Sequence, residues 1–80
     1  MTVQAGTGAA MAAARPDLLA RISPAQRRVL EFLLEGLTET QIAVHVGRSR
    51  HTVHDHTKAI YQTLGVNSRV QLVLTFSKPL

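Results

Sequence analysis

The stretch from residue 38 to residue 64 constrains the fold of this 80-residue chain more than any other. It contains two runs in which apolar residues recur at helical spacing, 39–46 and 50–64, with a short gap between them. Gly47 suits the end of the first helix, because a left-handed residue there costs least without a Cβ. Ser49 offers a hydroxyl to the free N–H groups that open the second helix. The sequence therefore predicts two helices joined by a tight turn.

The second of these helices is predicted to have one apolar and one polar side. Val53, Ile60 and Leu64 form the apolar stripe, which suits burial against the rest of the chain. The other side carries the charged and histidine side chains Arg50, His51, His54, Asp55 and Lys58. This is the layout of a helix-turn-helix whose second helix faces outward.

One further helix is predicted on each side of this pair. Residues 23–26, Ser-Pro-Ala-Gln, combine an N-cap serine, a proline suited to the first helical position and a glutamine that closes a capping box. The apolar stripe that follows continues to about Gly36. Asn67 or Ser68 is expected to cap a last helix. The prediction is an all-α fold, a compact four-helix bundle over residues 22–80 that contains the helix-turn-helix.

Residues 1–21 are expected to lie outside this bundle. Alanine, glycine and threonine dominate the first fourteen positions, which predicts a flexible arm or linker. The alternative for the second part of this segment is a short helix from Pro16 through Ile22 that caps the core. A start of this composition is typical of the linker that follows a receiver or ligand-binding domain.

Composition narrows the class of protein without defining it. The formal net charge of +4 suits a polyanionic partner, although ribosomal and membrane-surface proteins share this property. The chain has no cysteine, which excludes disulfides and thiolate metal sites. No apolar run approaches the ~18 residues of a membrane span, and the start does not read as a secretory signal. The expectation is a cytoplasmic protein with no membrane partner.

Metal binding and catalysis are both disfavoured. All four histidines lie between positions 45 and 56, but they fall on different helix faces and no second cluster completes a tetrahedral site. Ser49, His51 and Asp55 include the residue types of a hydrolase triad, yet they share one helix surface without an oxyanion hole. We therefore expect no metal, no cofactor and no enzymatic activity.

The last helix carries more apolar residues than one buried face needs. Val70, Val73 and Leu74 are expected to face the core, whereas Leu72 and Phe76 are expected to point elsewhere. Leu72 and Phe76 then either pack on the N-terminal arm, stay exposed, or form the seam of a symmetric dimer. The dimer seam is the preferred interpretation.

Residues 22–76 resemble the LuxR-type (GerE-like) DNA-binding domain of bacterial transcription regulators. The residues in register include the Ser23-Pro24 opening, Glu35-Gly36-Leu37, Ile42-Ala43, His51-Thr52-Val53, His56, Leu64-Gly65-Val66 and Ser68-Arg69. The resemblance implies a four-helix domain whose third helix enters the DNA major groove. It also implies a dimer, formed partly through the fourth helix, that binds two half-sites.

The resemblance also assigns roles to individual residues. It implies base contacts from His54, Asp55 and Lys58, and contacts to the DNA backbone from the residues around the turn. The predicted backbone-contacting residues are Thr38, Thr40, Arg48, Ser49, Arg50 and Thr52. Asp55 has two open interpretations, since it could accept a hydrogen bond from cytosine N4 or pair with His51 one turn earlier.

Four positions depart from the family pattern. Arg48 stands where an apolar residue is usual, and Asp55 is acidic at a base-facing position. His54 stands where lysine or arginine is common, and Thr40 where lysine is common. The changes at positions 40, 54 and 55 lower the local positive charge. Histidine titrates near neutrality, so we expect tighter DNA binding at pH 6 than at pH 8.

The predicted function is therefore that of a sequence-specific, duplex-DNA-binding transcription regulator. It would act in the bacterial nucleoid as a homodimer on an inverted repeat, with half-sites roughly 34 Å apart. RNA polymerase is a further candidate partner. The alternative is a protein that does not bind DNA but forms heterodimers with larger LuxR-type regulators and inhibits them.

Overall fold

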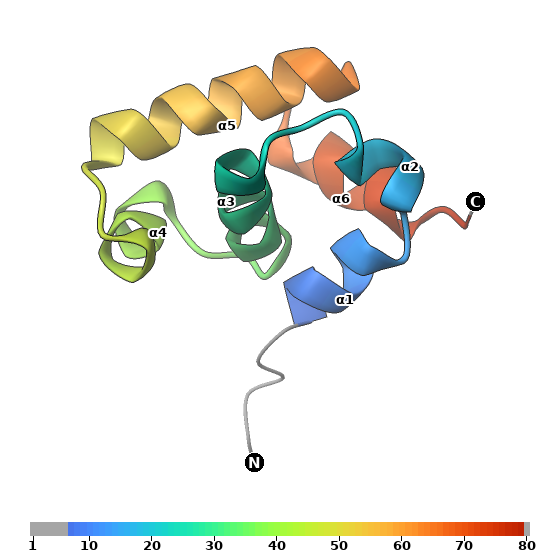
Figure 1. Ribbon diagram of the computed structural model, residues 1–80, viewed down its shortest axis with the longest axis horizontal. Helices are drawn as coiled ribbons and strands as arrows, with labels where there is room; N and C mark the ends of the chain where they lie inside the picture. The colour runs from blue at the N-terminus through green and yellow to red at the C-terminus, as the bar shows by residue number, and fades with distance from the viewer. Residues whose placement is uncertain (1–6, 80) are drawn as a thin grey trace.

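The computed structural model describes residues 7–79, which form an all-α fold as expected (Figure 1). Four of its helices correspond to the predicted bundle, and two short ones precede them. The helices are α1 (Thr7–Ala13), α2 (Pro16–Leu19), α3 (Pro24–Leu34), α4 (Glu39–Val46), α5 (Arg50–Leu64) and α6 (Arg69–Ser77).

The helix starts and ends follow the local signals of the sequence. The predicted capping box at the start of α3 is confirmed, since Ser23 Oγ accepts from Gln26 N and Gln26 Oε1 accepts from Ser23 N, both at 3.1 Å. The predicted caps Ser49 and Ser68 accept in the same way at the starts of α5 and α6. Gly47 ends α4 in the left-handed conformation, with φ of 68°. These interactions satisfy backbone groups that a helix end leaves free.

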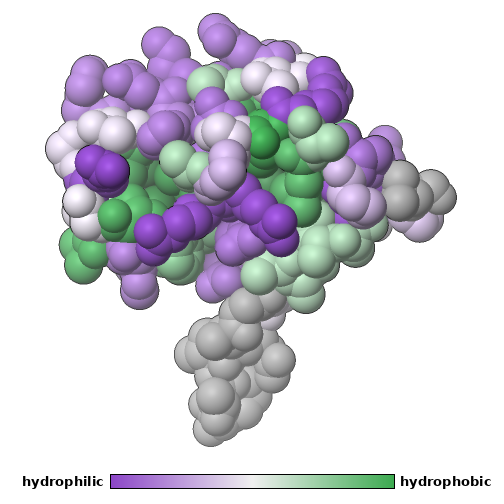
Figure 2. Space-filling model, in the orientation of Figure 1, coloured by the Kyte–Doolittle hydropathy of each residue, from purple (hydrophilic) through white to green (hydrophobic). Residues whose placement is uncertain are grey.

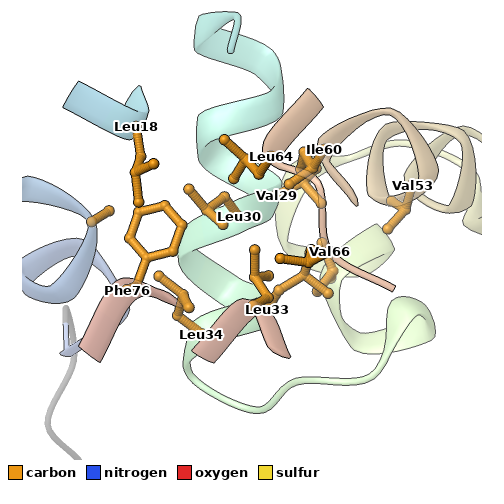
Figure 3. Packing of buried hydrophobic residues seen from close by; sticks show 13 residues of the cluster. Leu18, Val29, Leu30, Leu33, Leu34, Val53, Ile60, Leu64, Val66 and Phe76 are labelled. Atoms are coloured by element: carbon orange, nitrogen blue, oxygen red, sulfur yellow. The ribbon is translucent and has the colours of Figure 1, made fainter. Parts of the chain in front are cut away.

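Helix α3 lies at the centre of the molecule and contacts α1, α4, α5 and α6 (Figure 1). Its Leu30 and Leu33 are fully buried, and Figure 3 shows other core residues gathered on both sides of them. Ile60 of α5 is also fully buried. Burying a side chain of this size contributes about 1.5–3 kcal/mol, so this cluster is the main source of stability.

The first two helices pack on the bundle, so the expected flexible arm does not extend over residues 7–21. Ala12 of α1 is fully buried, and Leu18 of α2 joins the core. Helix α1 approaches α3 so closely that a Cβ on Gly8 would lie 1.9 Å from the carbonyl oxygen of Glu31. A helix begins at Pro16, as in the alternative expectation, but α2 ends at Leu19 and does not reach Ile22. The part of the expected arm before residue 7 lies outside the described residues.

The prediction for α6 was wrong about which side is buried. Leu72 and Phe76, assigned to a dimer seam, are 0% and 3% exposed, whereas Val70 and Leu74 are 69% and 56% exposed and Val73 is half-buried. The ring of Phe76 lies among core leucines contributed by α2 and α3 (Figure 3). Because α6 has apolar residues on both sides, its periodicity does not decide the orientation. Leu72 and Phe76 are therefore core residues and are not available to a partner.

Candidate nucleic-acid interface

The turn between α4 and α5 is held by short-range hydrogen bonds. The backbone N–H of Arg48 donates to the carbonyl of Ala43 at 3.1 Å, which closes the end of α4. Ser49 Oγ accepts from the backbone N–H of Thr52 at 3.1 Å and donates to Thr52 Oγ1 at 3.0 Å. These bonds set the direction in which α5 leaves the turn, as a helix-turn-helix requires.

Helix α5 separates a buried side from an exposed polar side, as predicted. Val53, Ile60 and Leu64 are buried, and Thr57 between them satisfies its hydroxyl by donating to the carbonyl of Val53 at 3.0 Å. On the other side His54, Asp55 and Lys58 are exposed. Figure 2 shows mostly hydrophilic atoms along the edge of the molecule that α5 occupies in Figure 1. The predicted exposure of this face is confirmed, and its contact with DNA stays a prediction.

Two of the exposed histidines have acidic neighbours. His51 Nε2 lies 3.5 Å from Asp55 Oδ2 one turn later on α5, which is the pairing that the sequence allowed for Asp55. His54 Nδ1 lies 3.0 Å from Glu39 Oε2, at the start of α4. Sequence reasoning missed this second contact, because the two residues are 15 positions apart and meet only when α4 packs on α5.

The structure divides the nine lysines and arginines into two groups. Arg15 and Arg27 pair with the carboxylates of Asp17 and Glu31, and Arg21 and Arg69 donate to the carbonyls of Thr63 and Leu37. In the described part of the chain the other side chains have no hydrogen bond or ion pair. These are Arg28, Arg48, Arg50, Lys58 and Lys78. All but Lys78 belong to the helix-turn-helix or line a hollow beside it.

That hollow lies between α3 and the turn of the helix-turn-helix. Its lining combines two unpaired arginines, a hydroxyl and an imidazole with small apolar walls. The lining residues are Ala25, Arg28, Val29, Val46, Arg48, Thr52 and His56. Arg28 was not among the predicted site residues, although a sequence signal existed. Arg27 has an acidic partner four residues later in Glu31, whereas Arg28 has none at that spacing.

The remaining predicted residues belong to the start of α4 and the start of α5. Thr38 caps α4, with its Oγ1 accepting from Gln41 N at 3.1 Å, and Thr40 is exposed in the first turn of that helix. Arg50 is exposed at the start of α5 and lines a second hollow with Glu39, His51 and His54. Nowhere between residues 7 and 79 do three or more metal-ligating side chains gather.

A compact all-α domain with an exposed polar second helix and unpaired cations around the turn defines the class of helix-turn-helix DNA-binding domains. Comparison with known families agrees with this class. The family model described as "Bacterial regulatory proteins, luxR family" matches residues 20–76, and the chain belongs to this family.

Curated relatives are named as transcription regulators or activators. The chain is 40% identical over 57 residues to the probable transcriptional regulatory protein SgaR of Hyphomicrobium methylovorum. It is 37% identical over 60 residues to the glycerol metabolism activator of Pseudomonas putida. These matches cover 71% and 75% of this chain but only 27% of each relative. No solved structure matched the chain.

The family is described as one of bacterial regulatory proteins, which is not a class of enzymes. It also confirms the resemblance predicted for residues 22–76, with boundaries that differ by two residues at the start. None of the helices that the structure describes is long and apolar enough to cross a membrane.

Proposed function

We propose that this chain binds duplex DNA sequence-specifically as a dimer and regulates transcription, with α5 lying in the major groove. The observation that carries this proposal is the distribution of unpaired cations. Arginines far from the turn are used within the fold, whereas Arg28, Arg48, Arg50 and Lys58 are left free beside it. Unpaired cations on one surface attract the DNA backbone, because each phosphate contact releases condensed counterions.

The DNA backbone is proposed to contact the residues around the turn. Arg28, Arg48 and the Thr52 hydroxyl line one hollow, which suits a single phosphate group. Ser49 already donates its only hydroxyl proton to Thr52 Oγ1, so Thr52 is the better phosphate donor of the two. Thr38, Thr40 and Arg50 extend this surface along α4 and the start of α5.

Base contacts are proposed for the exposed residues one or two turns into α5. His54, Asp55 and Lys58 lie on the side of the helix opposite its buried stripe. Lys58 supplies hydrogen-bond donors, which suit guanine O6 and N7, and Asp55 supplies acceptors, which suit cytosine N4. Asp55 also neighbours His51, so contact with a base competes with that pair.

The dimer is proposed to form through the exposed side of α6. Val70, Val73 and Leu74, with the stem of Arg69, line an apolar hollow on the surface. A two-fold axis beside this helix would cover the same residues on both copies. The two α5 helices would then meet an inverted repeat with half-sites roughly 34 Å apart. Leu74→Asp should give a monomer in sedimentation equilibrium and should abolish the preference for two half-sites over one.

A salt titration of DNA binding tests the proposal. Fluorescence anisotropy with random duplex should show binding at low salt that weakens steeply as salt rises. Arg48→Ala and Arg50→Ala should each reduce the slope of log K against log salt by about 0.9, because each removes one proposed phosphate contact. Lys78→Ala is the matched control, because Lys78 is also unpaired but follows α6, and it should leave the slope unchanged. Absence of binding at every salt concentration would refute the proposal.

One observation supports a second candidate function. The exposed apolar side of α6 could also bind a larger regulator of the same family, while Asp55 and Glu39 reduce the positive charge of the face that meets DNA. The chain would then inhibit its partner without binding DNA. The same titration separates the two functions, since this one requires no duplex binding at low salt.

A regulator of the proposed kind would act in the bacterial cytoplasm, at the nucleoid. RNA polymerase is proposed as a further partner only through this regulatory role. A pull-down with the DNA-bound dimer would test that partnership, with the Leu74→Asp variant as the control.

A further inference from the structure

The contact between Glu39 and His54 joins the two helices of the helix-turn-helix through their polar side chains. His54 Nδ1 lies 3.0 Å from Glu39 Oε2 and 3.2 Å from Glu39 Oε1, so both carboxylate oxygens face the same ring nitrogen. The other ring nitrogen, Nε2, makes no hydrogen bond in the part of the chain that the structure describes. The histidine side chain is 52% exposed. One edge of the ring is therefore held by the protein and the other is available.

This contact selects one tautomer of the neutral ring. An ionised carboxylate only accepts hydrogen bonds, so Nδ1 must carry the proton that lies between the two groups. In neutral histidine only one nitrogen is protonated, and the partner of one nitrogen determines what the other can do. Nε2 then carries a lone pair and acts as an acceptor. Free histidine favours the opposite tautomer, so Glu39 changes the chemistry that His54 presents.

We propose that Glu39 is a positioning residue for sequence specificity, which holds His54 as a hydrogen-bond acceptor for the exocyclic amino group of adenine or cytosine. The inference rests on the proposed function, in which His54 faces the major groove. There adenine N6 and cytosine N4 are donors, whereas guanine and thymine present acceptors at the corresponding place. Each base pair has one such amino group in the major groove, on its adenine or its cytosine. An acceptor at position 54 therefore distinguishes the strand that carries adenine or cytosine from the strand that carries thymine or guanine.

The charged groups around His54 define the conditions for a test. Glu39 faces it from α4, Arg50 and His51 line the same hollow, and Asp55 and Lys58 follow on α5. A protonated ring would donate from both nitrogens and would prefer guanine. The measurements therefore belong at pH 8, where histidine is ordinarily neutral.

The first test reads the tautomer directly and needs no DNA. In ¹⁵N–¹H correlation spectra at pH 8, His54 of the wild-type chain should show the pattern of a ring protonated at Nδ1. Glu39→Ala should shift it toward the form protonated at Nε2. Glu31→Ala is the matched control, because Glu31 has similar side-chain exposure, 25% against 27%, but pairs with Arg27 on α3. A wild-type ring protonated at Nε2 would overturn the inference whatever the chain binds.

The second test reads the base preference. Binding sites are first selected from a random duplex pool. The base pair to vary is the one at which the wild type shows a preference that His54→Ala lacks. Wild type should prefer adenine or cytosine there by about tenfold, as expected for one good base contact. Glu39→Ala should reduce this preference to less than about threefold, and adding it to His54→Ala should change nothing further. Glu39→Gln keeps the side-chain length and should weaken the preference, because an amide can also donate to Nδ1.

The outcomes separate this inference from the proposed function. A preference for guanine or thymine at that position, or a preference that survives in Glu39→Ala, would overturn the role of Glu39 while leaving DNA binding intact. Failure of the wild-type chain to bind any duplex would overturn the proposed function and this base preference together. Unfolding curves for each variant confirm that the domain is folded in the binding assay.

Discussion

Arg15 and Thr75 meet although they are 60 residues apart: Arg15 Nη1 donates to the carbonyl oxygen of Thr75 at 3.0 Å. The same nitrogen donates to the carbonyl of Lys78 at 2.9 Å, and the rest of the guanidinium pairs with Asp17. Arg15 thus supplies hydrogen bonds to free carbonyls in the last turn of α6, where a positive charge also suits the helix dipole. Arg15 therefore ties the segment before α3 to the C-terminal end of α6.

Arg15→Ala should therefore lower the thermal unfolding midpoint by several degrees, because the carbonyls of Thr75 and Lys78 lose their donor. Arg15→Lys should recover only part of the loss, since an ammonium cannot reproduce the planar fork. The matched control is Arg28→Ala, which removes an unpaired arginine and should change stability by no more than about 0.5 kcal/mol. Equal unfolding midpoints for the wild type and Arg15→Ala would show that these hydrogen bonds do not stabilise the fold.

The ion pair between Arg15 and Asp17 also predicts how the stability of the fold depends on pH. The hydrogen bond from Arg15 lowers the pKa of Asp17 below its usual value of 3.8. The folded state therefore binds this proton less readily than the unfolded state, and the ionised carboxylate stabilises the fold above the usual pKa. This contribution is lost as pH falls through the lowered pKa of the folded state. Asp17→Asn should consequently be less stable than wild type near neutrality, with a gap that closes in acid. A gap that widens below about pH 4 would exclude this account.

The parts of the fold that were predicted correctly depend on signals within a few residues. The bounds predicted for α4 and α5 agree with the structure, because Gly47, Ser49 and Gly65 mark helix ends locally. The orientation of α6 could not be decided in this way, since Phe76 is buried by leucines of α2 and α3 that lie far away in the sequence.

In the candidate site, too, the features set by local sequence were predicted and those set by tertiary packing were not. The exposure of His54 and Lys58 followed from the apolar stripe of α5, whose spacing is regular. The Glu39 contact and the hollow beside Arg28 depend on how α3, α4 and α5 pack together. No pattern along the chain reports such distances, so these two features required the structure.

Gly8→Ala tests how closely α1 packs on α3. In an open helix this change would stabilise the chain by about 1 kcal/mol, because alanine has the higher helix propensity. Here the new Cβ would lie 1.9 Å from the carbonyl oxygen of Glu31, so the helices must separate. We expect a loss of about 1–3 kcal/mol in denaturant unfolding, as for other overpacked sites. A lower free energy of unfolding for Gly8→Ala would support the close packing of α1 on α3, and a higher one would contradict it.

The matched control for this prediction is Ala10, two positions after Gly8 on the same helix. Ala10 is exposed on α1, so Ala10→Gly should cost only the propensity difference of about 0.5–1 kcal/mol. A stabilising Gly8→Ala beside a destabilising Ala10→Gly would show that α1 does not pack on α3 in solution.

Binding to DNA should be tighter at pH 6 than at pH 8 at the same salt concentration. His51 and His54 are exposed on the face proposed to meet DNA, and each has a carboxylate neighbour, Asp55 or Glu39. A positive charge on either ring would attract the polyanionic duplex, so the affinity at fixed salt should be higher at the lower pH. His51→Gln should reduce the difference between the two pH values. His45→Gln is the control, because the His45 ring stacks on Phe32 at 5.0 Å and has no proposed DNA contact. Equal affinities of the wild-type chain at pH 6 and pH 8 would contradict this prediction, and they would favour a DNA face whose positive charge comes from Arg28, Arg48, Arg50 and Lys58 alone.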